Sequence, residues 1–167
     1  MVDLASHIVA VPDFPKPGIL FRDIAPLLRQ HFGATVTALG ERLRADEWAA
    51  IDVIVGIESR GFVLGAALAE RYGKAFALVR KQGKLPPPVI AQAYDLEYGT
   101  GVLEMQHGEG RALLVDDVLA TGGTLRASAD LCVQAGYRVD ALLVLIDLRI
   151  VADFAWRDVP ARSVLQY

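Results

Sequence analysis

Three short apolar runs without a polar interruption decide which folds are open to this chain. They are VIVGI at 53–57, ALLV at 112–115 and ALLVLI at 141–146. Strands covered by helices on both faces have continuous patterns of this kind, whereas half-exposed strands alternate between apolar and polar residues. The three runs therefore predict buried parallel strands.

Helical patterns lie between the predicted strands. In GFVLGAALAERYG we expect Phe62, Ala66 and Ala69 to form the apolar stripe, with Gly73 at the end. The segment TLRASADLCVQAG follows the second run and also ends at a glycine. Strand, helix and strand in short succession predict an α/β fold, with a doubly wound, mainly parallel central sheet flanked by helices.

The same pattern predicts the position of a binding site. Ligands of doubly wound sheets bind beyond the carboxyl ends of the strands. Residues 58–61 and 116–124 directly follow two of the apolar runs. We therefore expect these two segments on one rim of the sheet.

Two segments depart from the alternation of strand and helix. Residues 80–106 hold a stretch rich in proline and glycine and then two strand-like pieces, joined around 98–101. We expect a flexible flap inserted there. The first thirty residues contain PDFPKPG, which is too rich in proline for a core strand, so residues 1–30 are expected to form a hood over an edge of the sheet. Residues 1–167 are expected to form a single domain.

Composition narrows the class of protein. A chain of 167 residues suits one globular core. The longest apolar run, Ala141 to Ile146, is far shorter than the roughly 20 residues of a membrane span. The early acid and the lack of a signal-like layout, with Cys132 as the only cysteine, predict a reducing, cytoplasmic setting. A net charge of −3 argues against nucleic acid as a partner.

The segment LLVDDVLATGGT carries the strongest chemical signal. Gly122 and Gly123 allow a close approach of backbone, and a helix beginning near Thr124 would point its free N–H groups at a phosphate. The plain alternative is that Thr124 only caps the helix. The neighbouring Asp116 and Asp117 favour a ligand, because adjacent carboxylates repel each other by about 1 kcal/mol unless sugar hydroxyls, a cation or a developing positive charge satisfies them.

Other phosphate and catalytic motifs are excluded by spacing. The chain has no G-x-x-x-x-G-K-[ST] and no G-x-G-x-x-G after a strand. GIESRG is not a nucleophile elbow, since Ile57 stands where that motif needs glycine. Three histidines and one cysteine without ligand spacing argue against a zinc site.

Five segments together resemble a known family. VDDVLATGGT resembles the motif by which type I phosphoribosyltransferases bind phosphoribosyl diphosphate (PRPP). With it, four more resemble the adenine phosphoribosyltransferase family: PDFPKPGILFRDI at 12–24, GIESRGF at 56–62, RKQGKLP at 80–86 and YDLEYG at 94–99. The resemblance implies transfer of a phosphoribosyl group from PRPP to adenine, giving AMP and pyrophosphate in the presence of Mg²⁺.

The resemblance also implies roles for the charged ends of the substrate. The ribose phosphate would be bound by Asp116, Asp117, Ala120, Thr121, Gly122, Gly123 and Thr124. Pyrophosphate would be bound by Ser59, Arg60, Arg80, Lys81 and Lys84. Mg²⁺ would be held mainly through PRPP and pyrophosphate, with Asp116 and Asp117 as the candidate protein carboxylates. A cis peptide bond between Glu58 and Ser59 is implied as well.

The base and the chemical step involve two further segments. Leu20, Phe21 and Arg22 would bind adenine, by stacking and by backbone contacts to its edge. The implied catalytic residues are Glu97, Asp117 and Arg60, with Glu97 as the acid or base beside Tyr98 of the flap. The family further implies a homodimer.

Two alternatives stay open at this point. The chain could be a regulator that binds PRPP without catalysis, although such a protein needs neither a base pocket nor a flap glutamate. It could instead run the same reaction on hypoxanthine, guanine or xanthine, because backbone contacts around residues 18–23 do not state which base edge is read.

Overall fold

The computed structural model describes residues 2–96 and 99–167. The chain divides into two compact units, Met1–Glu41 and Arg42–Tyr167. No helix in the described ranges is long and apolar enough to cross a membrane.

The first unit is a two-stranded sheet and a helix. Its elements are η1 (Ala5–His7), β1 (Val9–Pro12), β2 (Leu20–Asp23) and α1 (Ala25–Gly40). β1 and β2 pair antiparallel, and the turn between them is fixed by a 2.7 Å hydrogen bond from Gly18 N–H to Asp13 Oδ1. Helix α1 begins after Asp23, whose carboxylate accepts from Ala25 N–H at 2.9 Å, and kinks at His31. The role of this unit as a hood stays a prediction.

The second unit is built on an eight-stranded sheet in the order β5-β6-β4-β3-β7-β8-β10-β9. The strands are β3 (Val53–Ile57), β4 (Ala75–Lys81), β5 (Ile90–Leu96), β6 (Gly99–Met105), β7 (Gly110–Leu119), β8 (Tyr137–Asp147), β9 (Ala155–Trp156) and β10 (Val159–Gln166). β4, β3, β7, β8 and β10 are parallel, whereas β5, β6 and β9 join by antiparallel pairing. The three predicted strands and the mainly parallel sheet are confirmed.

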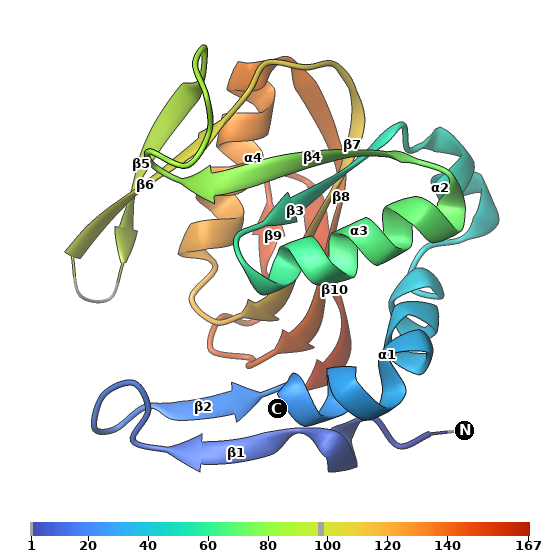
Figure 1. Cartoon of the computed structure of the whole chain (residues 1–167), viewed down its shortest axis with the longest axis vertical. Helices are drawn as coiled ribbons and strands as arrows, with labels where there is room; N and C mark the ends of the chain where they lie inside the picture. Colours follow the sequence, from blue (N-terminus) through green and yellow to red (C-terminus); the bar gives the residue numbers. More distant parts are fainter. Residues whose placement is uncertain (1, 97–98) are drawn as a thin grey trace. The chain divides into compact units, whose positions relative to one another are not determined.

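Two helices cover opposite faces of this sheet (Figure 1). Helix α3 (Arg60–Tyr72) connects β3 to its neighbour β4, and α4 (Gly123–Ala135) connects β7 to its neighbour β8 in the other direction along the sheet. Because such crossovers are right-handed, the reversal puts the helices on different faces. It also makes the gap between β3 and β7 the switch point at which ligands of doubly wound sheets bind.

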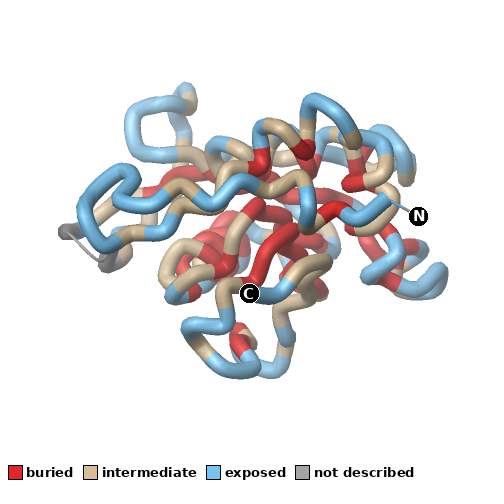
Figure 2. The backbone as a smooth tube through the Cα atoms, turned by 90° about the horizontal axis from the view of Figure 1, so that it is seen from below, coloured by how far each residue is buried: buried red, intermediate tan, exposed pale blue. Residues whose placement is uncertain are grey.

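Buried residues run through β3, β7 and β8. Figure 2 shows buried backbone in red and exposed backbone in pale blue. On the α4 side, Val53, Val55 and Ile57 share one cluster with residues of that helix, including the buried Cys132. Alternate strand residues face α3, where a Cβ added at Gly65 would lie 3.5 Å from Ile54 Cγ2.

The apolar stripe of α3 differs from the predicted one. The helix buries Gly61, Leu64, Gly65, Leu68 and Ala69, a spacing of three and four residues along one face. Ala66 is exposed and Phe62 half-buried, so the predicted stripe was wrong at both positions. Two of the buried positions are glycines, which carry no apolar side chain and so leave no mark in an apolar pattern. The predicted stop at Gly73 is confirmed by its φ of 60°.

The predicted flap segment contains an antiparallel hairpin at one edge of the sheet (Figure 1). β5 and β6 pair from Ile90↔Met105 to Leu96↔Gly99. The strands thus end and begin earlier than the predicted joint at 98–101. Glu97 and Tyr98 lie outside the described residues.

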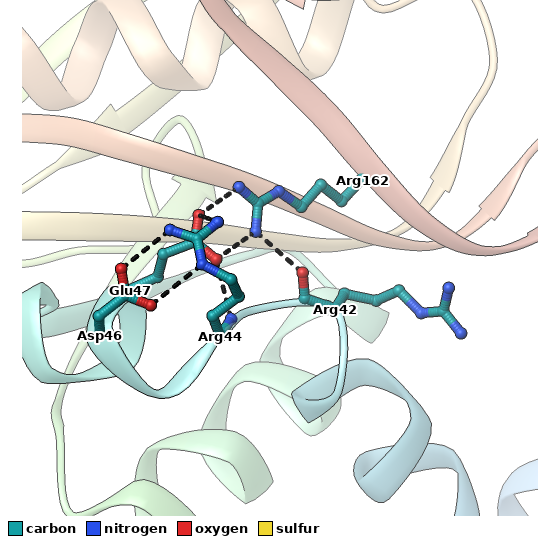
Figure 3. A network of polar contacts seen from close by, with 5 residues as sticks. All are labelled: Arg42, Arg44, Asp46, Glu47 and Arg162. Carbon is teal, nitrogen blue, oxygen red and sulfur yellow. Dashed lines mark hydrogen bonds and ion pairs between the residues drawn. The ribbon is translucent and has the colours of Figure 1, made fainter.

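A charged network ties the short helix α2 (Ala45–Ala50) to β10 (Figure 3). Both Glu47 carboxylate oxygens accept from the Arg162 guanidinium, and Glu47 Oε2 also accepts from Arg44 N–H at 2.8 Å. Arg162 Nη1 donates in addition to the Arg42 carbonyl at 2.9 Å. The Arg162 hydrogen bonds, followed by the one from Arg44 N–H, lower the pKa of Glu47 from 4.5 to about 2.

Candidate active site

The two segments predicted to share a rim meet at the switch point between β3 and β7. β3 ends at Ile57, the Glu58–Ser59 peptide bond is cis as the resemblance implied, and α3 begins at Arg60. Arg60 Nε lies 2.6 Å from Asp117 Oδ2 on β7. The structure thereby brings two of the three predicted catalytic residues into direct contact.

Gly61 allows this close approach. A Cβ at this position would lie 2.6 Å from the Val115 carbonyl oxygen and 3.2 Å from both Cα and Oδ1 of Asp116. Real Cβ atoms do not come so near to backbone, so the first turn of α3 can rest on β7 only where residue 61 has no side chain. The contact places the Asp116 carboxylate against that turn.

Asp116 and Asp117 lie within β7, which corrects the expectation that they follow the end of a strand. The ladder to β3 stops at Gly56↔Val115, but the ladder to β8 continues to Leu119↔Asp147. The two aspartates therefore begin where β7 stops pairing with β3 and continues to pair with β8. A run of apolar letters could not show this, since the strand continues through polar residues.

The two carboxylates are buried and incompletely satisfied. Asp116 is 8% exposed and accepts from Asp117 N–H at 2.8 Å. Asp117 is 7% exposed, and no described group donates a hydrogen bond to its Oδ2, which has the ion pair with Arg60 Nε as its charged contact. Burial, and next the charge of Asp117, raise the pKa of Asp116 well above its usual range. Such a pair suits sugar hydroxyls or positive charge.

The loop after β7 presents a helix end. Helix α4 begins at Gly123, its N-cap is Gly122 with φ of 83°, and none of the described side chains caps it. The first cap bond runs from Arg126 N–H to the Gly122 carbonyl at 2.9 Å. The early N–H groups of a helix lack intrahelical acceptors and carry the positive end of its dipole. Thr124 is thus not the cap that the plain alternative required.

Phe154 backs this loop and was missed from sequence. A Cβ at Gly122 would lie 2.1 Å from the Phe154 ring, and Arg126 Cζ lies over the same ring, 5.3 Å from its centre. Phe154 lies in the segment between β8 and β9, which carries no recognisable motif. Nothing in the order of residues points from 154 to 122.

The predicted pyrophosphate residues lie at two neighbouring strand ends. Ser59 is the N-cap of α3, and Arg80 at the end of β4 donates from Nε to Glu58 Oε2 at 3.2 Å. Lys81 N–H donates to the same oxygen at 3.0 Å. Burial opposes ionisation of Glu58, but these hydrogen bonds and the charge of Arg80 outweigh it, so its pKa is lowered. Lys81 and Lys84 have exposed side chains.

The predicted adenine residues belong to the first unit. Leu20, Phe21 and Arg22 lie on β2, and the Phe21 ring meets Phe14 edge-on, with 5.1 Å between the ring centres. Their role towards a base stays a prediction, as does that of Glu97.

A groove at the other ends of the strands lacks these features. Its volume is about 450 Å³, and it is lined by residues of α2, β7, β8 and β10. Two of its arginines are already paired, because Arg111 and Arg138 both form ion pairs with Asp140. The described residues include no cluster of three or more metal ligands there or elsewhere.

Comparison with known proteins identifies the class of protein to which this chain belongs. The family described as "Phosphoribosyl transferase domain" matches residues 27–149. The adenine phosphoribosyltransferase of Hydrogenovibrio crunogenus is 49% identical over 165 residues, which are 98% of this chain and 96% of that protein.

Solved structures agree in fold and length. The adenine phosphoribosyltransferase of Thermoanaerobacter pseudethanolicus superposes with a TM-score of 0.90 at 38% identity, over 99% of this chain and 98% of that one. The Saccharomyces cerevisiae protein, complexed with an imino-altritol bisphosphate and adenine, gives a TM-score of 0.89 at 32% identity over 98% and 97% of the two chains. The chain belongs to the phosphoribosyltransferases and, among them, to the adenine phosphoribosyltransferase family.

Proposed function

We propose that this protein transfers the 5-phosphoribosyl group from PRPP to adenine. N9 of the base forms a bond to C1′, the bond from C1′ to the pyrophosphate oxygen breaks, and AMP and pyrophosphate leave. One observation carries the proposal: the free helix end at 120–124 lies beside the buried pair of carboxylates at the switch point. The names of the relatives and the adenine complex of the yeast protein support it.

The ribose phosphate occupies the loop after β7. Backbone N–H groups of residues 120–124 and the hydroxyls of Thr121 and Thr124 donate to the phosphate oxygens, with the dipole of α4 behind them. Gly122 and Gly123 leave room for the phosphate. Asp116 and Asp117 accept from the ribose hydroxyls.

The carboxylates also stabilise the reacting carbon. Positive charge grows at C1′ as pyrophosphate leaves, and a unit charge about 4 Å away is worth about 4 kcal/mol at an effective dielectric of 20. In the structure, Arg60 Nε forms an ion pair with Asp117 Oδ2 at 2.6 Å. Pyrophosphate competes for Arg60 when PRPP binds, which frees the Asp117 carboxylate for the sugar.

Pyrophosphate is bound by the basic side chains and Mg²⁺. The hydrogen bonds and the positive charge come from Ser59, Arg60, Arg80, Lys81 and Lys84. Mg²⁺, when bound, neutralises phosphate oxygens, and the carboxylate oxygen Asp117 Oδ2 without a hydrogen bond fits such a hard cation. Since the described residues hold no ligand cluster, Asp116 and Asp117 would supplement ligands from substrate and water.

Base binding and proton transfer fall to the remaining predicted residues. Leu20, Phe21 and Arg22 hold adenine by stacking and backbone contacts. Glu97 accepts the proton on N7 as N9 attacks, and closure of the flap with Tyr98 excludes water from PRPP. We also propose a cytoplasmic homodimer that acts on these small molecules rather than on nucleic acid or membrane.

A base survey tests the reaction. Purified protein is mixed with PRPP, Mg²⁺ and each purine or pyrimidine base in turn, and nucleotides are separated by chromatography. Formation of AMP from adenine alone is expected. Nucleotide from hypoxanthine, guanine or xanthine instead would change the substrate, and PRPP binding without any product would make the protein a regulator.

A further inference from the structure

The basic segment between β4 and β5 has an ordered backbone although its side chains are exposed. Each N–H group from 81 to 85 has an acceptor: Glu58 for Lys81, the Val102 carbonyl for Gln82, and Glu104 for Gly83, Lys84 and Leu85. Five consecutive N–H groups with acceptors restrict the backbone conformation of this segment. Three of the five depend on one side chain.

Glu104 takes the place that an anion would occupy in this turn. Gly83 N–H donates to Oε2 at 3.0 Å, and Lys84 and Leu85 N–H donate to Oε1 at 2.7 and 2.6 Å. Consecutive N–H groups that converge in this way form an anion-binding nest. Glu104 is 3% exposed and lies opposite Arg80 in the β4–β6 ladder, so the sheet sets the position of its carboxylate.

Other contacts close the turn from its sides. Arg80 Nη1 donates to the Lys84 carbonyl at 3.3 Å, and Gln106 Nε2 donates to the Pro86 carbonyl at 3.2 Å. The nest is therefore filled from inside the protein, and its N–H groups are not free for a substrate phosphate. Within the described residues the ammonium groups of Lys81 and Lys84 form no ion pair or hydrogen bond.

We infer that Glu104 is a positioning residue that fixes the 82–85 turn and thereby aims Lys81 and Lys84 at pyrophosphate. The inference rests on the proposed function for the identity of the anion. Glu104 itself touches no substrate. Its removal releases three N–H groups and lets the turn move, and a displacement of about 1 Å can weaken a positioned contact by up to about a hundredfold.

The test compares Glu104→Gln with Glu109→Gln, which removes an equal charge from an exposed position five residues on. Glu104→Gln keeps the side-chain size but turns one acceptor into a donor. We expect the amides of Gly83, Lys84 and Leu85 to exchange hydrogen at least about tenfold faster in this variant. Glu109→Gln should exchange them like the wild type. Unchanged exchange in Glu104→Gln would overturn the anchoring role.

Pyrophosphate binding tests the functional part. Titration calorimetry with pyrophosphate and Mg²⁺ should give a Kd about tenfold or more above wild type in Glu104→Gln. The KM for PRPP should rise by a similar factor while the KM for adenine changes by less than about twofold, a split that general destabilisation does not produce. If Glu104→Gln does not fold, Glu104→Asp, which keeps the charge on a shorter stem, takes its place with a smaller effect in the same direction.

The outcomes separate the two proposals. Wild-type pyrophosphate affinity in Glu104→Gln, with AMP formed by the wild type, overturns the inference and leaves the reaction standing. Pyrophosphate affinity that depends on Glu104, without AMP from the wild type, supports the inference and overturns the reaction.

Discussion

Two charged clusters in the second unit are both built from carboxylates and arginines, but the pKa of a carboxylate falls in one cluster and rises in the other. In the network of α2 and β10, Glu47 receives hydrogen bonds from Arg162 and Arg44, and its pKa falls to about 2. In the site on β7, Asp117 Oδ2 receives no hydrogen bond from any described group, and the pKa of Asp116 rises. The hydrogen bonds to both Glu47 oxygens stabilise the fold. The buried carboxylates of Asp116 and Asp117 have fewer hydrogen bonds, which costs stability and leaves oxygens available to a ligand.

Among the variants, Asp117→Asn should show the largest difference between its effect on kcat and its effect on stability. The change keeps the shape and removes the charge opposite the reacting carbon, so kcat should fall by about a hundredfold to a thousandfold. Stability should change little, because the variant loses both the desolvation cost of a buried carboxylate and its ion pair with Arg60. Steady-state rates and urea unfolding measure the two. Wild-type turnover in this variant would remove Asp117 from the mechanism.

Gly122→Ala tests the loop rather than the charges. The new methyl group meets the Phe154 ring, and φ of 83° is unfavourable for alanine. We expect a loss of about 1–3 kcal/mol in unfolding free energy and a rise of about tenfold in the KM for PRPP. Gly33→Ala is the matched control, because a Cβ there meets nothing within 4 Å. Equal behaviour of the two variants would contradict the role of Phe154.

Glu47→Gln should do the reverse of Asp117→Asn. Loss of the charge-assisted hydrogen bonds should lower the unfolding free energy by about 1–2 kcal/mol, with kcat unchanged. Because the folded pKa of Glu47 lies below its ordinary 4.5, its contribution is present above pH 4.5 and is lost as the pH falls towards 2. Urea unfolding at several pH values should show the gap between wild type and variant closing in acid. A gap independent of pH would show that the charge is not responsible.

Asp116→Asn should have a small effect on stability, opposite in sign to that of Glu47→Gln. The folded state binds the Asp116 proton more tightly than the unfolded chain, so this residue lowers stability as the pH rises between the two pKa values. The variant should gain up to about 1 kcal/mol at pH 7 and lose that gain in acid. Thermal unfolding against pH measures this. A variant less stable than wild type at pH 7 would place Asp116 among the stabilising groups.

What could be predicted from the sequence was local or repetitive. Continuous apolar runs gave β3, β7 and β8, and the glycines at helix ends gave correct stops, because backbone conformation there depends on a single residue. The buried stripe of α3 was misjudged, since Gly61 and Gly65 are buried for their lack of a side chain. The extension of β7 through Asp116 and Asp117 was hidden because only the neighbouring β8 supports it.

The contacts that define the site are long-range, and for that reason sequence order did not reveal them. Arg60 and Asp117 were both named from motifs, but their ion pair depends on the order of strands. Phe154 behind Gly122, Glu58 beneath Arg80 and Glu104 beneath the basic turn were absent from the prediction. Each of them acts by supporting another residue, and such support leaves no spacing to recognise.

The single cysteine gives the protein a practical property. Cys132 is fully buried in α4, and burial raises the pKa of its thiol to about 12. The thiolate that alkylating dyes attack is therefore scarce and out of reach at neutral pH. A cysteine introduced at the exposed Thr100 of β6 would accept a fluorophore selectively in an otherwise native chain, so the hairpin's response to substrate could be followed by spectroscopy.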